Sequence, residues 1–119
     1  MARPQRSRRI CDTPEFNVFR PSSRLLSAGT TEEETIVLTL DEFEALRLID
    51  HEGLTHSDCA VQMNISRTTV TEICESARKK VADALVLGKT LAISGGQWEL
   101  CKGGRNDCNM SSCFRAEDR

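Results

Sequence analysis

The middle of the chain contains two residues that are typical of helix starts, Thr55 and Ser66, with a residue typical of a helix end, Asn64, between them. Thr55 opens a short helical segment. Asn64 ends it, because asparagine is among the few residues besides glycine that tolerate left-handed backbone angles. Ser66 then caps a longer segment whose apolar residues recur every three or four positions, and a glycine follows its end. We expect this last helix to cover residues 66–87.

The residues around the break have the layout of a helix-turn-helix. Ala60 supplies a small residue where two crossing helices touch, while Met63, Ile65 and Val70 supply apolar contacts on both sides of the turn. In this arrangement the first turns of the second helix meet base edges in the major groove of DNA. An ordinary helical hairpin with a solvated polar face remains the alternative.

The helix after the break carries two groups of side chains that could contact DNA. Its first turns offer donors and acceptors of mixed type for base edges. Its second half is basic and could bind phosphates, which position a protein without specifying sequence. The predicted base contacts are Arg67, Thr68, Thr69, Thr71 and Glu72, and the predicted phosphate contacts are Arg78, Lys79 and Lys80.

The flanking segments complete a predicted fold that is mainly α. Thr39 and Glu42 have the spacing of a capping box and predict a helix from about 40 to 51. Residues 35–38 form either a short strand or the approach to that helix. Residues 91–100, with two glycines in the middle, predict a β-hairpin that packs on the helices or pairs with residues 36–38.

This organisation divides the chain into three parts. The first part, residues 1–34, is a basic extended arm and loop. The second, residues 35–100, is the helix-turn-helix domain of three helices with its C-terminal hairpin. The third, residues 101–119, is a flexible tail that contains cysteines.

Charge is segregated along the chain although the formal net charge is only −2. Residues 1–30 hold six basic and two acidic residues, whereas residues 31–60 hold one basic and nine acidic residues. A basic arm of this kind can enter the minor groove beside a helix-turn-helix, where narrow A·T tracts attract arginine. A solubilising tail is the alternative. The arginines of the arm are Arg3, Arg6, Arg8 and Arg9.

Several separated motifs in residues 1–100 resemble a known family. They include RRIC at 8–11, LTLDEFEALRL at 38–48, SARKKVADAL at 76–85 and the glycine pair at 95–96. The family consists of small prokaryotic proteins without a characterised function. Its members are predicted to bind DNA through a helix-turn-helix similar to region four of sigma-70 factors. The resemblance implies this fold and a DNA partner, and it supplies neither a target sequence nor verified functional residues.

The six cysteines fall into two groups. Cys59 and Cys74 lie beside apolar residues of the predicted helices and are expected in the core. The others could hold zinc or an iron–sulfur cluster, since both take soft thiolate ligands, although their spacing matches neither a zinc ribbon nor a ferredoxin. Reduced thiols in a flexible tail are the alternative. The candidate ligands are Cys11, Cys101, Cys108 and Cys113.

Together these features predict a cytoplasmic, non-enzymatic transcriptional regulator that binds double-stranded DNA, with the cysteine cluster as a candidate metal or redox sensor. No catalytic motif, membrane-spanning run or secretory signal is recognisable. We expect a homodimer, with the hairpin and the residues Phe43, Leu87 and Trp98 as the candidate interface. Two alternatives remain open. One is a protein-interaction module that docks its acidic first helix, through Glu42 and Glu44, on a basic partner such as RNA polymerase. The other is a metal or iron–sulfur carrier.

Overall fold

The computed structural model describes residues 7–22 and 34–102, and this part of the chain mixes helices with strands. None of its helices combines the length and apolar character needed to cross a bilayer. The elements, in chain order, are β1 (Arg8–Ile10), β2 (Val18–Phe19), β3 (Thr35–Leu38), α1 (Leu40–Leu46), the π-helical turn η3 (Arg47–His51), α2 (His56–Met63), α3 (Arg67–Leu87), β4 (Thr90–Ile93) and β5 (Trp98–Leu100).

The three predicted helices are present, and their starts are capped as expected. Thr39 and Glu42 form a reciprocal capping box, in which the Glu42 N–H donates to Thr39 Oγ1 and the Thr39 N–H donates to Glu42 Oε1 at 2.9 Å. Thr55 accepts the N–H of Asp58 at the start of α2. Ser66 caps α3 in the same way. These side chains satisfy backbone donors that a helix start otherwise leaves without a partner.

The strands form two small sheets and not a C-terminal hairpin. β4 lies between β2 and β3, antiparallel to β2 and parallel to β3, so only the first strand of the expected hairpin pairs with residues 36–38. β5 instead pairs in parallel with β1, with Ile10 opposite Leu100. The prediction of a mainly α fold with a hairpin is therefore wrong: the described part of the chain is mixed α/β. The glycines at 95 and 96 carry the chain from one sheet to the other.

The predicted extended arm is also wrong for the residues that the structure describes. Arg8–Ile10 forms β1, and Val18–Phe19 forms β2 at an edge of the three-stranded sheet. Both strands pair with partners from the C-terminal part of the chain. The N-terminal segment is thus an integral part of the fold, since its hydrogen-bond partners lie more than seventy residues away.

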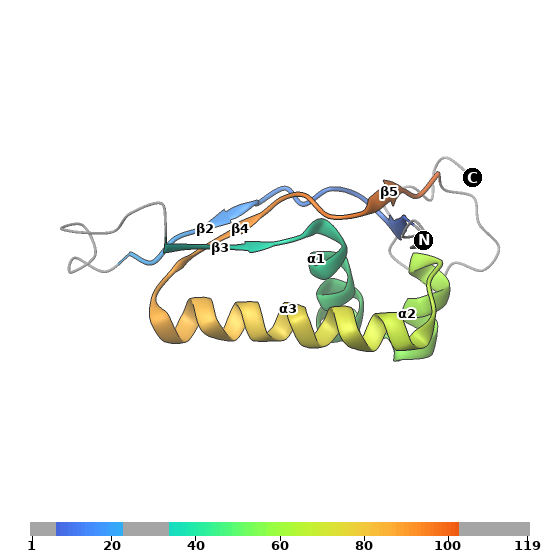
Figure 1. Cartoon of the computed structure of the whole chain (residues 1–119). Helices are drawn as coiled ribbons and strands as arrows, with labels where there is room; N and C mark the ends of the chain where they lie inside the picture. The colour runs from blue at the N-terminus through green and yellow to red at the C-terminus, as the bar shows by residue number, and fades with distance from the viewer. Residues whose placement is uncertain (1–6, 23–33, 103–119) are drawn as a thin grey trace, which may run out of the picture.

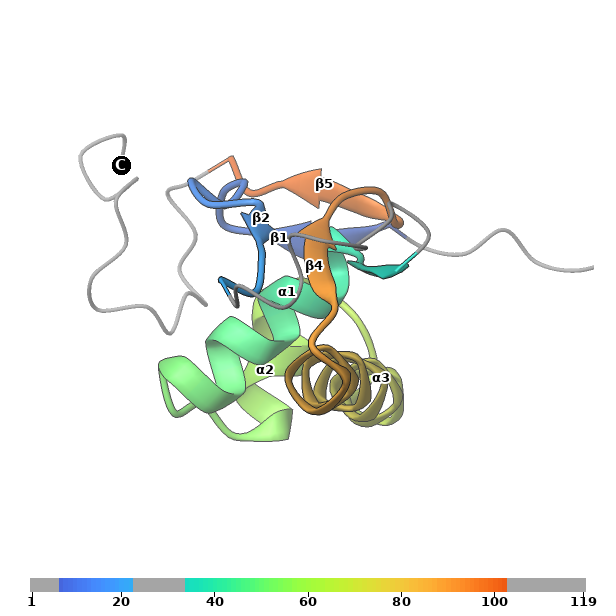
Figure 2. The ribbon, with the colours of Figure 1, turned by 90° about the vertical axis from the view of Figure 1, so that its left-hand side faces the viewer.

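The strands lie on one side of the molecule and α3 runs along the other, with α1 between them (Figure 1). Viewed down α3, the other helices lie beside it and the strands lie across the top (Figure 2). One apolar cluster joins the helices and contains Leu48, Met63 and Val70. A second lies between the strands and the helices and includes Leu38 and Ala77. Each cluster removes apolar surface from water, which is the main favourable contribution to folding.

Candidate nucleic-acid interface

α2 and α3 meet at a tight corner formed by the backbone of Asn64. Asn64 adopts the left-handed conformation expected for it, with φ 58° and ψ 46°. The N–H of the next residue, Ile65, donates back to Ala60 O at 3.0 Å. Ser66 then begins α3, and its Oγ accepts the N–H of Thr69 at 3.1 Å. Hydrogen bonds therefore fix the corner on both sides.

Buried side chains hold the two helices together at this corner. Met63 and Val70 are completely buried, and the small side chain of Ala60 is 7% exposed. His56 is the first residue of α2, and its Nδ1 lies 3.0 Å from the hydroxyl oxygen of Thr71 on α3. The relative position of the two helices is therefore set by apolar packing and by one polar contact.

The first turns of α3 face solvent with a polar surface. Arg67, Thr68 and Glu72 are exposed. Thr69 and Thr71 are half-buried, and both hydroxyls already have partners within the corner. Of the five predicted base contacts, the three exposed side chains are therefore the ones most accessible to a ligand.

Sequence reasoning missed one residue of this surface. Glu75 is exposed and lies three positions after Glu72 and seven after Thr68, on the same face of α3. That helical spacing was the signal that could have identified it. Its carboxylate adds negative charge beside the single guanidinium of Arg67, so attraction to phosphates is weak at this surface.

Two of the predicted phosphate contacts form exposed ion pairs within the chain. Arg78 donates two hydrogen bonds to Asp50, at 2.7 and 3.0 Å. These bonds lower the pKa of the Asp50 carboxyl. Lys79 lies 2.7 Å from Asp83 one turn further along α3. Both pairs are open to solvent, where an ion pair contributes little stability and can exchange its partner for another anion.

The third of these cations, Lys80, is half-buried. Its Nζ donates to Glu42 Oε1 at 2.6 Å, and Ser76 also donates to the Glu42 carboxylate. Burial by itself raises the pKa of Glu42. The hydrogen bonds from Lys80, Ser76 and Thr39 outweigh that effect and hold the pKa below its ordinary value. Lys80 therefore connects α3 to the start of α1.

The acidic residues of α1 point into the molecule. Asp41, Glu42 and Glu44 are each less than a tenth exposed. Glu44 accepts two hydrogen bonds from Arg47, and Asp41 Oδ2 lies 3.8 Å from Arg8 Nε. Carboxylates buried with cationic partners do not offer the exposed acidic surface that docking on a basic protein would require.

The arginines of β1 contact the protein itself. Arg9 donates to Gln62 O at 2.8 Å and to Val61 O at 2.9 Å, at the C-terminal end of α2. A cation at this end also interacts favourably with the helix dipole. The other two arginines predicted for the minor groove, Arg3 and Arg6, lie outside the described residues.

Replacing Arg9 with alanine is expected to lower the free energy of unfolding by about 1–3 kcal/mol, because two charge-assisted hydrogen bonds are lost. Chemical denaturation measures this change. Arg20→Ala, which removes an exposed guanidinium, is the control and should change the stability by about 0.5 kcal/mol or less. Unchanged stability in Arg9→Ala would contradict the role of this arginine in holding α2.

The structure brings two of the four candidate metal ligands together. The N–H of Cys101 donates to Ile10 O at 2.7 Å, which extends the β1–β5 ladder by one residue. Cys11 and Cys101 directly follow the paired residues Ile10 and Leu100 at the ends of β1 and β5, and both are buried. Cys108 and Cys113 lie outside the described residues. Within residues 7–22 and 34–102, no group of three or more potential ligands is assembled.

The buried thiols differ in their surroundings. Gln62 donates its side-chain N–H to Cys11 Sγ at 3.5 Å. Burial and the nearby carboxylate of Glu44 raise the pKa of Cys11 to about 11. Cys59 and Cys74 lie in the core as predicted, and burial raises the pKa of Cys59 to about 12. The thiols of Cys11 and Cys59 are therefore protonated at neutral pH, and a metal binding Cys11 would have to displace its proton.

Comparison with known proteins places the chain in a family. Residues 1–101 match the family described as "Protein of unknown function DUF134". A UPF0251 protein of Desulfitobacterium hafniense (strain Y51) is 44% identical over 119 residues, which cover 100% of this chain and 91% of that protein. A UPF0251 protein of Methanococcus vannielii is 40% identical over 124 residues, covering 98% of this chain and 92% of that protein. No solved structure gives a significant match. The chain belongs to the DUF134 family.

Proposed function

We propose that the chain is a DNA-binding transcriptional regulator in which α2 and α3 act as a helix-turn-helix. The observation that carries this proposal is the corner between the two helices, which is rigidly held and presents the exposed side chains of Arg67, Thr68 and Glu72. Arg67 would donate to guanine or phosphate, Thr68 to a base edge or phosphate, and Glu72 would accept from the amino group of cytosine.

The position of these residues at a helix start favours DNA as the partner. The first backbone N–H groups of α3 and the positive end of its dipole point toward the same solvent-facing turn. Phosphate groups bind readily at such ends. Because Glu72 and Glu75 are also there, non-specific attraction to DNA should be weak, and useful affinity would depend on base contacts.

Weak non-specific attraction is also the reason to expect a dimer. Two copies related by a twofold axis would contact two half-sites, which lie about 34–36 Å apart on B-DNA when they are one helical turn apart. The combined contacts would then give the affinity that one polar helix face lacks. Sedimentation of the free protein and of the protein bound to a palindromic site tests this expectation.

The DNA proposal is tested by selecting sequences from a random duplex pool and measuring affinity by fluorescence anisotropy across a salt series. Arg67→Ala should weaken binding to the selected sequence by about 1–3 kcal/mol, because a charge-assisted contact is removed. The fall in affinity with salt should become less steep in that variant.

Lys102→Ala is the matched control, because it also removes one exposed cation but follows β5 and belongs to neither α2 nor α3. It should change affinity by about twofold or less. If no sequence is enriched, or if Arg67→Ala binds as tightly as Lys102→Ala, the proposed helix-turn-helix function is wrong.

We further propose that the regulator senses metal or redox state through a thiolate site that contains Cys11 and Cys101. Their position directly after the paired strands β1 and β5 supports this, and the side-chain N–H that Gln62 donates to Cys11 Sγ resembles the outer hydrogen bonds that orient metal ligands. Cys108 and Cys113 would complete a set of four sulfur ligands. Such a site suits zinc or an iron–sulfur cluster.

Titration of the reduced full chain with cobalt(II) under anaerobic conditions tests the thiolate site. The wild type should show sulfur-to-cobalt charge-transfer absorption, and Cys101→Ser should lose most of it because one ligand is removed. Cys74→Ser is the control, since Cys74 is a buried cysteine of α3. Equal spectra in the two variants would exclude Cys101 as a ligand.

A further inference from the structure

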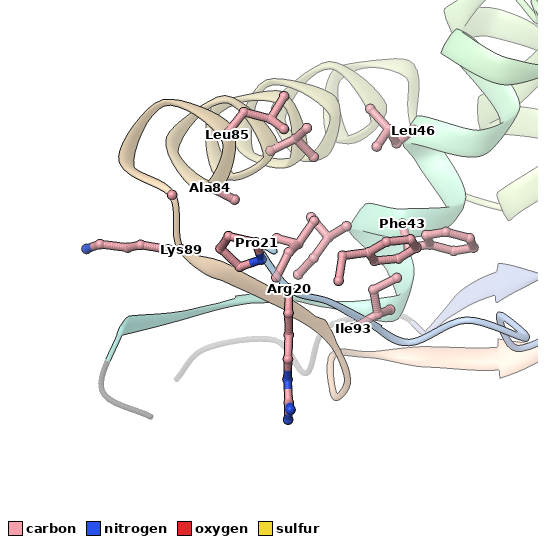
Figure 3. Close-up of a pocket in the computed structure, with 13 residues that line it drawn as sticks. Arg20, Pro21, Phe43, Leu46, Ala84, Leu85, Lys89 and Ile93 are labelled. Carbon is pink, nitrogen blue, oxygen red and sulfur yellow. The ribbon is translucent and has the colours of Figure 1, made fainter. Parts of the chain in front are cut away.

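A cavity of about 460 Å³ lies at the opposite end of α3 from the candidate DNA surface. It opens between the C-terminal half of α3, α1 and the three-stranded sheet (Figure 3). Phe43 and Leu46 line it from α1, Ala84 and Leu85 from α3, and Ile93 from β4. The cavity therefore lies where the helices and the sheet meet.

The lining of this cavity is apolar, and none of its residues is acidic. Aliphatic and aromatic side chains come from every element around it. Its volume lies within the range of about 300–1,000 Å³ that is typical of small-molecule sites. Both its size and its chemistry therefore suit the hydrocarbon part of a small ligand.

Two cations lie at the edge of the opening. The stems of Arg20 and Lys89 contribute to the lining, and their charged ends extend away from the apolar interior (Figure 3). Among the described residues neither side chain takes part in a hydrogen bond or ion pair. A cation beside an apolar cavity complements a molecule that carries an anionic group at one end of an apolar body.

We propose that this cavity binds a small amphiphilic carboxylate, with its hydrocarbon chain or ring against Phe43, Leu46 and Ala84. Its carboxylate lies at the opening, where the long side chain of Arg20 or of Lys89 turns toward it on binding. The cavity volume accommodates a single medium-length chain, so we take the occupant to be a free small molecule and not a bilayer lipid. Burial of the hydrocarbon would supply most of the affinity, and the two cations would select an acid over a neutral molecule of equal length.

The cavity and the candidate DNA surface share one rigid element. α3 spans 21 residues, or about 31 Å, from Arg67 at the candidate DNA surface to Leu87 at the end where the cavity lies. A ligand that contacts Ala84 and Leu85 could therefore alter DNA affinity by favouring one position of this helix. Only this regulatory step rests on the proposed DNA function, because ligand binding itself does not require DNA.

Calorimetry with the full chain, octanoate and octanol tests the proposal in the absence of DNA. Octanoate should bind the wild type more tightly than octanol does. The double variant Arg20→Gln, Lys89→Gln should bind octanoate about three- to tenfold more weakly and octanol about as well as the wild type does. Both changes are polar substitutions at the opening, so they test the site without disturbing the core.

A pair of alanine replacements on α3 tests the cavity itself. Ala84→Phe places a ring in the cavity and should weaken octanoate binding by about tenfold or more. Ala82→Phe makes the same change on the exposed side of the helix and should bind like the wild type. Circular dichroism checks that both variants fold.

Three results would overturn the proposal. The first is a folded wild type that does not bind octanoate. The second is equal binding of octanoate by the double variant and the wild type. The third is that sedimentation shows the wild type to self-associate, that Ala84→Phe abolishes this self-association, and that octanoate does not change it. This surface would then be an interface between two copies of the chain. A DNA-binding failure with intact octanoate binding would reject the regulatory step and the helix-turn-helix proposal alone.

Discussion

Replacing Glu44 with alanine is expected to lower the free energy of unfolding by about 3–5 kcal/mol, because it breaks a buried charged network. Glu44 is 1% exposed and accepts hydrogen bonds from Arg47 Nε at 2.8 Å and Arg47 Nη2 at 3.0 Å. It also accepts the backbone N–H of Cys11 at 2.8 Å. Alanine at this position leaves the guanidinium and the N–H without their acceptor.

The electrostatics of Arg47 support the size of this effect. Burial lowers the pKa of Arg47, but the hydrogen bonds and the charge of Glu44 outweigh burial and raise it above its ordinary value. This carboxylate therefore stabilises the buried guanidinium charge of Arg47 in the folded state. Its other carboxylate neighbour, Glu52, lies at 3.6 Å and cannot replace both bonds.

Urea denaturation of Glu44→Ala and of Asp83→Ala measures the difference between a buried and an exposed ion pair. Asp83 pairs with Lys79 on the surface of α3, and its loss should cost about 0.5 kcal/mol or less. Equal losses in the two variants would mean that the Glu44 network contributes no more than a surface pair.

The positions of the helices could be predicted because their signals are local. Thr39, Thr55 and Ser66 each cap a helix start through a hydrogen bond within three residues, and Asn64 ends α2 through its own backbone angles. Such interactions are encoded in a few consecutive residues. The exposure of Arg67 and Thr68 follows from the same local periodicity.

The sheets could not be predicted in the same way because their pairing is non-local. A glycine pair between two short apolar runs favours a hairpin, yet β5 pairs with β1, and Arg8 lies opposite Trp98 in their register. Residues 8–10 carry two charges and one apolar side chain and show no strand pattern of their own. Their strand conformation depends on the packing of Ile10 in the core and on the ladder with β5.

The charge of the sequence segments gave a wrong expectation of the charged surface, and the reason is again that contacts between distant segments decide it. The acidic and basic segments are separate in sequence, but folding brings Lys80 against Glu42 and Arg78 against Asp50. Much of the segregated charge is thereby neutralised inside one molecule. The net charge of each segment therefore overstated the charge available to a partner, whether DNA or protein.

The glycine pair between the two sheets gives the second large expected effect. Gly96→Ala should lower the free energy of unfolding by about 2–5 kcal/mol, from backbone strain and from overlap with its neighbours. Gly96 has φ +94°, and a Cβ there would lie 2.5 Å from Asp41 Oδ1 and 2.8 Å from Thr39 Cβ. Both atoms belong to the start of α1, where Thr39 forms the capping box.

Gly95→Ala is a matched control for this effect, because Gly95 also has a positive φ of 72° but has open space where its Cβ would be. It should therefore cost only the backbone strain, about 1–2 kcal/mol. Thermal and urea unfolding of the two variants separate strain from overlap. If the two glycines were required only for their positive φ angles, as in a hairpin turn, Gly95→Ala and Gly96→Ala would be equally destabilised. A larger loss in Gly96→Ala means that this glycine is required for the close contact of the sheet connection with α1.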